Sequence, residues 1–309
     1  MQTLTNFNDF PTHHRDAVVV VGNFDGVHMG HRYLLAQARD LAAVEKRSFV
    51  ALTFEPHPRS VLHANGEPFR LTPWPVKARL LAAEKIDVCV CLEFTTSLAT
   101  LSARRFVADV LDQALGAGRV VVGEGFAFGH GQMGDVELLR QMLGPDRVQV
   151  ISRQSGHDAE WSASAIRQAL RQGRPEDAAC ALGRFWSLEG TVISGNRLGH
   201  QIGVPTANVR LDQELRPRRG VYAVTVTLEV EDKTADYSGI ANLGTRPTVG
   251  GSHDLLETHI FGHDLDIYGR SIRVALRRFV RDEKRFPNLE ALRDQITRDI
   301  ADVRAAEHL

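Results

Sequence analysis

The sequence predicts an α/β protein in which a parallel-sheet domain is followed by an antiparallel β-barrel. Three observations lead to this prediction: the length of 309 residues, the alternating strand and helix patterns of the first half, and the closely spaced strands of the second. A chain of this length exceeds the usual size of one compact domain, so two domains are expected. Apolar residues make up 43% of the chain, which is enough to give each domain a core.

The first half alternates strand and helix patterns. Ala17–Val21 is a short, continuous apolar run, which is typical of a strand buried on both faces. The next pattern, Tyr33–Val44, places its apolar residues on one face of a helix. Such alternation predicts a parallel sheet with helices on both faces. The other elements expected here are strands at Ser48–Phe54, Val88–Leu92, Val120–Val122 and Val148–Ile151, and helices at Val76–Glu84, Arg104–Leu115 and Val136–Leu143.

The pattern changes in the second half. A helix over Ser164–Leu182, expected to break at residues 173–175, leads out of the first domain, and we place the boundary at residue 184. This gives domains of residues 1–184 and 185–309. Closely spaced strands without intervening helices predict an antiparallel barrel, closed by a helix that starts after Pro287 with Asn288 as its N-cap. The expected strands are Leu188–Ile193, Tyr222–Leu228, Ser238–Asn242, Leu255–Phe261 and Ile272–Phe279.

Composition narrows the class of function. The formal net charge of −1 argues against a nucleic-acid binder, which normally carries a strong basic excess. No apolar run approaches the roughly 18 residues of a membrane span, and the N-terminus lacks the layout of a signal peptide, so we expect a cytoplasmic protein. Three sparse cysteines, Cys89, Cys91 and Cys180, are interpreted as reduced thiols rather than as a disulfide framework.

The stretch Gly22–His31 carries the first chemical signal. It lies between the first buried strand and the first helix, where parallel sheets bind ligands, and its glycines allow a polyphosphate to approach the helix N-terminus closely. His28 and His31 are three residues apart, so they face the same way and could donate hydrogen bonds to phosphate oxygens. The alternatives are two incidental surface histidines or a zinc site, for which His57 is the only nearby further ligand.

Gly22–His31 resembles the signature Gly-x-Phe-Asp-Gly-x-His-x-Gly-His of the HxGH nucleotidylyltransferases, in the form found in prokaryotic FAD synthetases. The resemblance implies a Rossmann-like domain in which the FMN phosphate attacks the α-phosphorus of ATP and pyrophosphate leaves. It continues through Thr53–Pro58, Leu71–Pro73 with Lys77, Val121–Gly129 and Ser162–Arg167. The implied roles are catalysis for His28 and His31, ATP or phosphate binding for Gly22, Phe24, Asp25, Gly30, Ser162, Ser164 and Arg167, and flavin binding for Phe54, Pro56, Phe126 and Phe128.

This first domain also departs from the family pattern. Gly125 stands where the family usually has an aspartate, and Glu124 is expected to point to the opposite face of an extended segment. Gln132 stands where a basic residue is common, Ala163 replaces a serine, and Ser164 replaces a threonine. We therefore expect adenylylation to be the weaker activity if the chain has two.

The stretch Gly203–Asn208 carries the second chemical signal. Thr206 and Asn208 alternate, so on an extended segment both side chains share one face and offer oxygen ligands suited to Mg²⁺ and its phosphates. A simple turn would explain this stretch about as well. Together with the segments that follow, however, it resembles the riboflavin kinase domain over its full length. These segments are Arg219–Ala223, Asn242–Thr248, Leu256–His259, Asp264–Gly269 and Arg281–Phe286.

The kinase resemblance implies that Thr206 and Asn208 hold Mg²⁺ and ATP, that Gly199 contributes to ATP binding, and that Arg281 contacts the flavin. It implies that Glu257 is the general base on the ribityl 5′-hydroxyl. The two halves together, over residues 15 to 305, are similar to the bacterial bifunctional riboflavin kinase/FAD synthetase family. ATP, riboflavin and FMN are the implied substrates, and FMN and FAD the products.

Three alternatives remain open from the sequence. The chain could be a riboflavin kinase with a degenerate adenylyltransferase domain. It could be a nucleotidylyltransferase for another acceptor, such as pantetheine phosphate or nicotinamide mononucleotide, although the kinase-like half argues against this. It could also be a flavin-binding protein without catalytic activity. The sequence makes no prediction of the oligomeric state.

Overall fold

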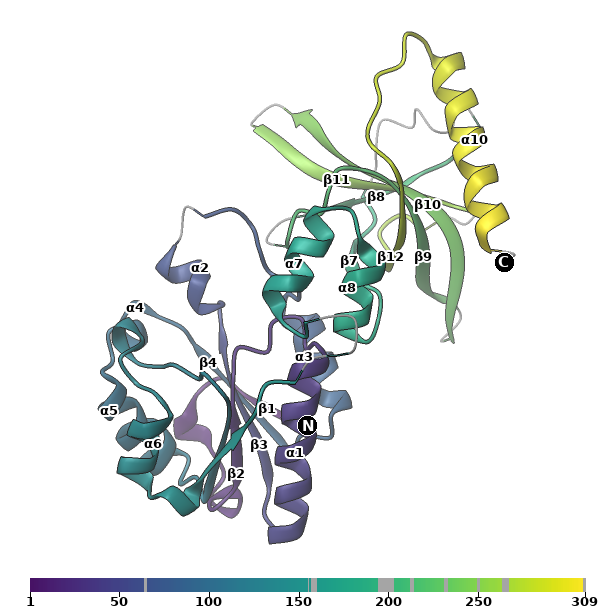
Figure 1. Cartoon of the computed structure of the whole chain (residues 1–309). Coiled ribbons are helices and arrows are strands. Elements are labelled where there is room, and N and C mark those ends of the chain that lie inside the picture. The colour runs from purple at the N-terminus through teal and green to yellow at the C-terminus, as the bar shows by residue number, and fades with distance from the viewer. Residues whose placement is uncertain are drawn as a thin grey trace. The chain divides into compact units, whose positions relative to one another are not determined.

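The chain divides into two compact units, Met1–Ala163 and Ser164–Leu309, in a computed structural model. Each unit is described by itself (Figure 1). This division assigns the two helices between residues 163 and 182 to the second unit. The domain boundary at residue 184 stays a prediction. The structure describes residues 1–63, 66–154, 156, 160–193, 203–211, 214–230, 233–248, 251–262 and 267–307.

The first unit is built on a six-stranded parallel sheet with the strand order β1-β4-β3-β2-β5-β6. The predicted parallel sheet is therefore confirmed. The edge strand β1 was not predicted, because three residues are too short to show a pattern. The strands are β1 (Gln2–Leu4), β2 (Val18–Val21), β3 (Phe49–Glu55), β4 (Val88–Glu93), β5 (Arg119–Gly123) and β6 (Val148–Ile151).

Helices cover both faces of this sheet (Figure 1). Val18 and Val20 pack against α1 and α3, whereas Val19 and Val21 face the layer formed by η3 and α6. One strand therefore contributes to two cores, which explains its continuous apolar run. The helices are α1 (Met29–Glu45), α2 (Pro58–Leu62), α3 (Trp74–Ala83), α4 (Thr96–Ala99), α5 (Ala103–Arg105), α6 (Val136–Leu143) and the π-helix η3 (Phe106–Ala114). Short 3₁₀ turns lie at Phe7–Asp9, Thr12–His14, His130–Gln132 and Pro145–Arg147.

The helix predicted over Arg104–Leu115 exists, but most of it is a π-helix. Its apolar residues recur at intervals of four and five, with Phe106, Val110 and Leu115 buried on the sheet side. The wider turn of i→i+5 hydrogen bonding keeps residues at these intervals on one face. Sequence periodicity alone therefore predicted the helix without its type.

The strand order creates a ligand-binding position at the carboxyl end of β2. The chain runs from β2 through β3 to β4 on one side, and β5 and β6 lie on the other. The order thus reverses between β2 and β5, and such a switch point is where open α/β sheets bind ligands. Residues 22–28 leave β2 at this point and lead into α1.

The second unit is a six-stranded antiparallel sheet with the order β7-β12-β9-β10-β11-β8. The Ile193 amide donates to the Asn208 carbonyl at 2.9 Å, which joins the ends of the sheet and confirms the predicted barrel. The strands are β7 (Ser187–Thr191), β8 (Ala207–Arg210), β9 (Gly220–Val230), β10 (Lys233–Thr248), β11 (Gly251–Ile260) and β12 (Ser271–Arg281). The helices are α7 (Ala163–Arg171), α8 (Pro175–Leu182) and α10 (Leu289–Glu307).

The structure confirms two predictions about the helices of this unit. The terminal helix α10 places Val303 against Val221 and Ile240 on the outer face, and the Asn288 side chain accepts from the Ala291 amide as the predicted N-cap. The predicted break between α7 and α8 is confirmed. It lies at Gly173, whose positive φ of 72° suits glycine.

No helix of the described residues is long and apolar enough to cross a membrane.

Candidate active sites

The β2–α1 loop presents the two predicted histidines at a helix N-terminus. His28 is the N-cap of α1, and its Nδ1 accepts from the His31 amide at 3.3 Å. The two imidazoles stack with ring centroids 3.6 Å apart, so the prediction that they face the same way is confirmed. Because Nδ1 of His28 accepts this bond, the ring carries its proton on Nε2, which is therefore a donor. The helix N-terminus adds a further attraction for an anion.

Close packing explains two glycines of this motif. A Cβ atom on Gly22 would lie 3.0 Å from the Phe24 ring, and one on Gly30 would lie 2.9 Å from the Trp161 carbonyl oxygen. Phe24 is fully buried and meets the His31 ring edge-on at 5.4 Å. Gly22, Phe24 and Gly30, predicted to bind phosphate, thus form the packed base under the histidines.

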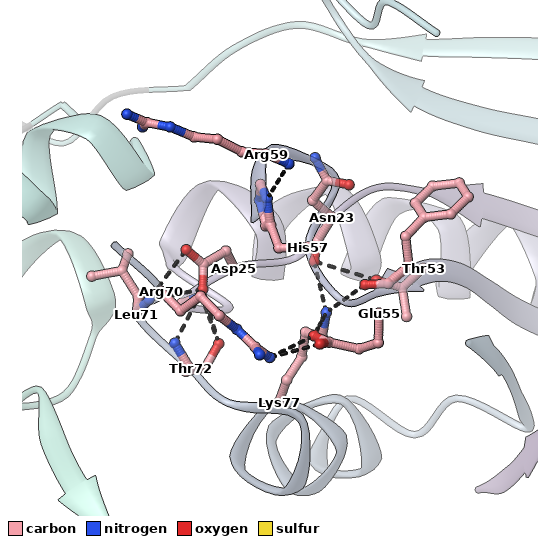
Figure 2. A network of polar contacts seen from close by, with 12 residues as sticks. Asn23, Asp25, Thr53, Glu55, His57, Arg59, Arg70, Leu71, Thr72 and Lys77 are labelled. Carbon is pink, nitrogen blue, oxygen red and sulfur yellow. Dashed lines mark hydrogen bonds and ion pairs between the residues drawn. The ribbon is translucent and has the colours of Figure 1, made fainter. Parts of the chain in front are cut away.

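The Asp25 carboxylate is directed into the protein. It is buried and accepts hydrogen bonds from the Leu71 amide at 3.0 Å, the Thr72 amide at 3.0 Å and the Thr72 hydroxyl at 3.3 Å (Figure 2). The Thr72 hydroxyl in turn accepts from the Gly26 amide at 2.9 Å. These contacts clamp the loop to residues 71–72, whereas the ATP-binding role of Asp25 stays a prediction.

A second group of charges lies at the other end of the loop. Lys77 Nζ is 2.7 Å from Glu55 Oε1 and donates to the carbonyls of Asn23 at 3.3 Å and Phe54 at 3.2 Å. Arg70 Nη2 contacts the same Glu55 carboxylate at 2.7 and 2.8 Å (Figure 2). The sequence reasoning assigned no role to these three charged residues. Glu55 lies within the family segment Thr53–Pro58, and Lys77 was part of the same resemblance, but their contact could not be read from the sequence.

In the second unit, a row of polar side chains crosses three strands. Asn208 of β8 is the register partner of Glu257 of β11, which is the partner of Asn242 of β10. Directly paired residues in antiparallel strands share a face, so the three side chains line one surface. Asn208 is 4% exposed, and its Oδ1 accepts no hydrogen bond from the residues that the structure describes. The sequence reasoning missed Asn242, which only strand register brings into this row.

Thr206 lies immediately before β8, two residues ahead of Asn208. The imidazole of His259 donates from Nδ1 to the Pro205 carbonyl at 2.8 Å, and His259 follows Glu257 by two residues on the same face of β11. This bond fixes the chain at Pro205, one residue before Thr206. His259 was part of the quoted family segment, but its contact could not be read from the sequence.

Arg281 of β12 binds the terminal helix α10. Its guanidinium contacts the buried Asp299 carboxylate through Nη2 at 2.7 Å and Nε at 2.9 Å, and Gln295 donates to the same carboxylate at 2.8 Å. Arg281 is also the register partner of Val221, which pairs with Asn242, so the buried Val221 separates this ion pair from the polar row. The predicted flavin contact of Arg281 is not tested by this geometry and stays a prediction.

The comparisons with known proteins cover both units. The model of the FAD synthetase family matches residues 10–165, and that of the riboflavin kinase family matches residues 182–307. A bifunctional riboflavin kinase/FMN adenylyltransferase of Escherichia coli K12 is 38% identical over 284 residues, covering 91% of this chain and 90% of the relative. The relative of the same name from Pseudomonas fluorescens is 35% identical over 309 residues, covering 99% and 97%.

The chain belongs to the bifunctional riboflavin kinase/FMN adenylyltransferase family. The architecture is shared with the crystal structure of a macrolide-efflux protein from Streptococcus pneumoniae, with a TM-score of 0.85 and 30% identity over 98% of each chain. The resemblance inferred from the sequence motifs is therefore confirmed.

Aromatic side chains predicted to bind flavin in this bifunctional family gather beside the switch point of the first sheet. Phe126 and Phe128 stack at 5.3 Å, and Phe106 joins them to Phe54 at centroid distances of 5.5 and 6.3 Å. Phe128 is buried in the core, whereas Pro56 is exposed beyond the end of β3. The fold thus brings three of the predicted residues together, and their contact with flavin stays a prediction.

One detail of the family comparison was wrong. Glu124 and Gly125 do not lie on an extended segment but in a tight turn, in which the Phe126 amide donates to the Gly123 carbonyl at 3.1 Å. Gly125 has a positive φ of 80°, which glycine adopts without strain. The turn allows Glu124 to accept from the Arg153 amide at 3.2 Å. Gly123 and Gly125 on either side of Glu124 are a signal for a turn that the sequence reasoning did not use.

The remaining predicted residues lie around α7 or outside the described structure. Ser162 precedes α7 at the end of the first unit, and Ser164 and Arg167 lie in its first two turns, within the second unit. Arg167 is largely buried. Gly199 lies outside the described residues. The phosphate-binding roles of all four stay predictions.

Proposed function

We propose that the chain is a bifunctional enzyme that phosphorylates riboflavin to FMN with ATP and then adenylylates FMN to FAD with release of pyrophosphate. The observation that carries this conclusion is that one chain holds both the paired histidines at a helix N-terminus and the Asn208–Glu257 pair on the barrel. Incubation with riboflavin, ATP and Mg²⁺, followed by chromatography for FMN and FAD, tests both steps. FMN without FAD would identify a kinase alone.

The adenylyl step uses the β2–α1 loop. The FMN phosphate is already an anionic nucleophile, so it attacks the α-phosphorus of ATP without a general base. Its oxygen forms the new P–O bond as the bond to pyrophosphate breaks. His28 Nε2 and the α1 N-terminus supply donors and positive potential for the charge that accumulates on the phosphoryl oxygens. His31 is stacked on His28, so it holds that ring in place and extends the donor surface.

The kinase step uses the polar row on the barrel. Glu257 takes the proton of the ribityl 5′-hydroxyl as that oxygen attacks the γ-phosphorus, and ADP leaves with the electron pair of the broken P–O bond. Asn208 lies opposite Glu257 and Asn242 on its other side, which confines the carboxylate between two amides. Phosphoryl transfer requires mostly positioning and charge stabilisation, so few protein groups are needed.

Mg²⁺ fits the Asn208–Thr206 end of this row. The buried Asn208 Oδ1 has no hydrogen-bond donor among the described residues, and an oxygen of this kind suits a hard divalent cation. Thr206 offers a hydroxyl two residues earlier. When bound, the ion neutralises the charge of the ATP phosphates. The protein contributes the two oxygen ligands and the His259–Pro205 bond that holds their segment.

The cysteines support a reducing, cytoplasmic location for this ATP-dependent chemistry. Cys89, Cys91 and Cys180 are all free thiols. Burial raises the pKa of Cys89 to about 12 and that of Cys91 to about 11, so both stay protonated and unreactive near neutral pH. Cys180 is exposed, and free thiols of both kinds are typical of intracellular proteins.

A further inference from the structure

We propose that Lys77 is a positioning residue for the β2–α1 loop and that Glu55 and Arg70 hold it in that role. This inference rests on the proposed adenylyltransferase activity. The side chain is 1% exposed, although it is a lysine in a region where phosphate is expected to bind. Burying an ammonium is costly unless it is paired and hydrogen-bonded, so its contacts must explain its presence.

The contacts use the whole ammonium group. An ammonium has three N–H donors, and Lys77 Nζ has three acceptors: Glu55 Oε1 at 2.7 Å and the carbonyls of Phe54 at 3.2 Å and Asn23 at 3.3 Å. A phosphate oxygen could reach this nitrogen only if one of these bonds broke. The buried, fully bonded arrangement in Figure 2 therefore indicates a positioning role rather than a phosphate-binding role.

Lys77 acts on the loop through the Asn23 carbonyl. This carbonyl also accepts from the Thr53 hydroxyl at 3.3 Å, so it is held from two sides by α3 and β3. In a trans peptide the carbonyl and the following N–H point in opposite directions. Lys77 therefore sets the direction of the Phe24 amide, which belongs to the segment expected to contact phosphate.

The loop needs such support because its backbone is strained. Phe24 and Val27 have positive φ values of 50° and 40°, which bulky and β-branched residues rarely adopt. Strained conformations of this kind persist only where the surrounding structure holds them. The Asp25–Thr72 bonds hold the middle of the loop, and Lys77 holds its start.

The Glu55–Arg70 ion pair holds Lys77 in position. The Glu55 carboxylate faces both Lys77 and Arg70, and its side chain is 16% exposed. Two cations contact this one carboxylate, which fixes its position between them. Glu55 also directly follows Phe54, whose carbonyl is the third partner of Lys77. The end of β3 and the loop after β2 are thereby joined through one nitrogen.

Lys77→Met in the full chain tests the proposal. We expect the adenylylation kcat, measured with supplied FMN, to fall roughly 10- to 100-fold, because misplacement of a catalytic segment by about 1 Å can cost this much. The KM for ATP should change less, and riboflavin phosphorylation by the same preparation should be unchanged. The matched control is Lys85→Met, an exposed lysine of the same unit. Adenylylation by Lys77→Met at the wild-type rate would overturn the proposal.

A charge-balanced variant separates positioning from folding. Glu55→Gln leaves the buried Lys77 without its anion, and Glu55→Gln/Lys77→Met removes that unpaired ammonium, so thermal unfolding should recover toward wild type relative to Glu55→Gln alone. Adenylylation should remain low, because the Asn23 and Phe54 carbonyls still lack their donor. Recovery of stability and adenylylation together would show a merely structural role and overturn the proposal.

Amide hydrogen exchange of residues 22–31 gives a readout that does not depend on activity. Exchange should be faster in both Lys77 variants and unchanged in Lys85→Met. Wild-type exchange in the double variant would overturn the positioning role even if no FAD were made. Absence of FAD from the wild-type chain, with these exchange changes present, would overturn the proposed function alone.

Discussion

The two candidate sites are built in opposite ways. In the first unit a strained loop carries the candidate residues, and contacts from β3, the 70–72 segment and α3 hold it. In the second unit Asn208, Glu257 and Asn242 lie on regular strands, and the hydrogen-bonded ladder holds them. A site on a ladder depends mainly on its own side chains, whereas a site on a loop depends equally on the residues that support it.

The largest expected change in rate comes from a substitution in the barrel site formed by Asn208, Glu257 and Asn242. Glu257→Gln keeps the size and register of the residue but removes the general base, so riboflavin phosphorylation should fall about 10²–10⁴-fold. FAD formation from supplied FMN should persist, because Glu257 lies on β11 whereas the paired histidines lie at the start of α1. Measuring both rates on one preparation checks this. Equal loss of both activities in a folded variant would contradict the separation of the two sites.

The corresponding change at the loop site should be more complex. His28→Ala removes a donor to the phosphoryl oxygens, so adenylylation should fall by roughly 10²–10³-fold. It also removes the α1 N-cap, which should lower the free energy of unfolding by about 1 kcal/mol. His28→Asn is the matched control, because asparagine restores the cap without the imidazole. If His28→Asn recovered adenylylation fully, the helix cap rather than the imidazole would be the important feature.

The departures from the family pattern sharpen the comparison of the two activities. Gly125 lacks a carboxylate, and Ala163 lacks a hydroxyl. A lost hydrogen bond to a charged group is worth about 1.5–3 kcal/mol, or roughly 10- to 150-fold in rate. We therefore expect adenylylation to be slower than phosphorylation when FMN and FAD are quantified with saturating ATP and Mg²⁺. Equal rates would show that these departures do not matter.

The smallest expected effect concerns the domain boundary. The Arg218 amide donates to the Leu170 carbonyl at 3.0 Å, and the Arg218 guanidinium donates to the Gln172 carbonyl at 3.5 Å. Leu170 and Leu182 of the connecting helices are also buried. A fragment of residues 185–309 should therefore make FMN but unfold about 2 kcal/mol more easily than a fragment of residues 164–309. Denaturant titration of both fragments checks this, and equal stability would favour the boundary at residue 184.

Much of the fold could be predicted because its signals are local. The apolar run at Val18–Val21, the helical face of α1 and the Asn288 cap depend on residues close together in sequence. The histidine pair could be predicted for the same reason, since residues three apart on a helix always face the same way. The type of η3 could not be predicted, because apolar patterns do not distinguish between hydrogen-bonding schemes.

The sequence by itself determined the two-part architecture, both motifs and the family. Only the tertiary structure decided what holds the motifs in place. Asp25 meets Leu71 across 46 residues of chain, and Lys77 meets Asn23 across 54. Asn242 joins Glu257 through strand register. Contacts between distant segments leave no periodic signal, because the fold chooses these partners by bringing strand ends and loops together and requiring every buried charge and carbonyl to be bonded.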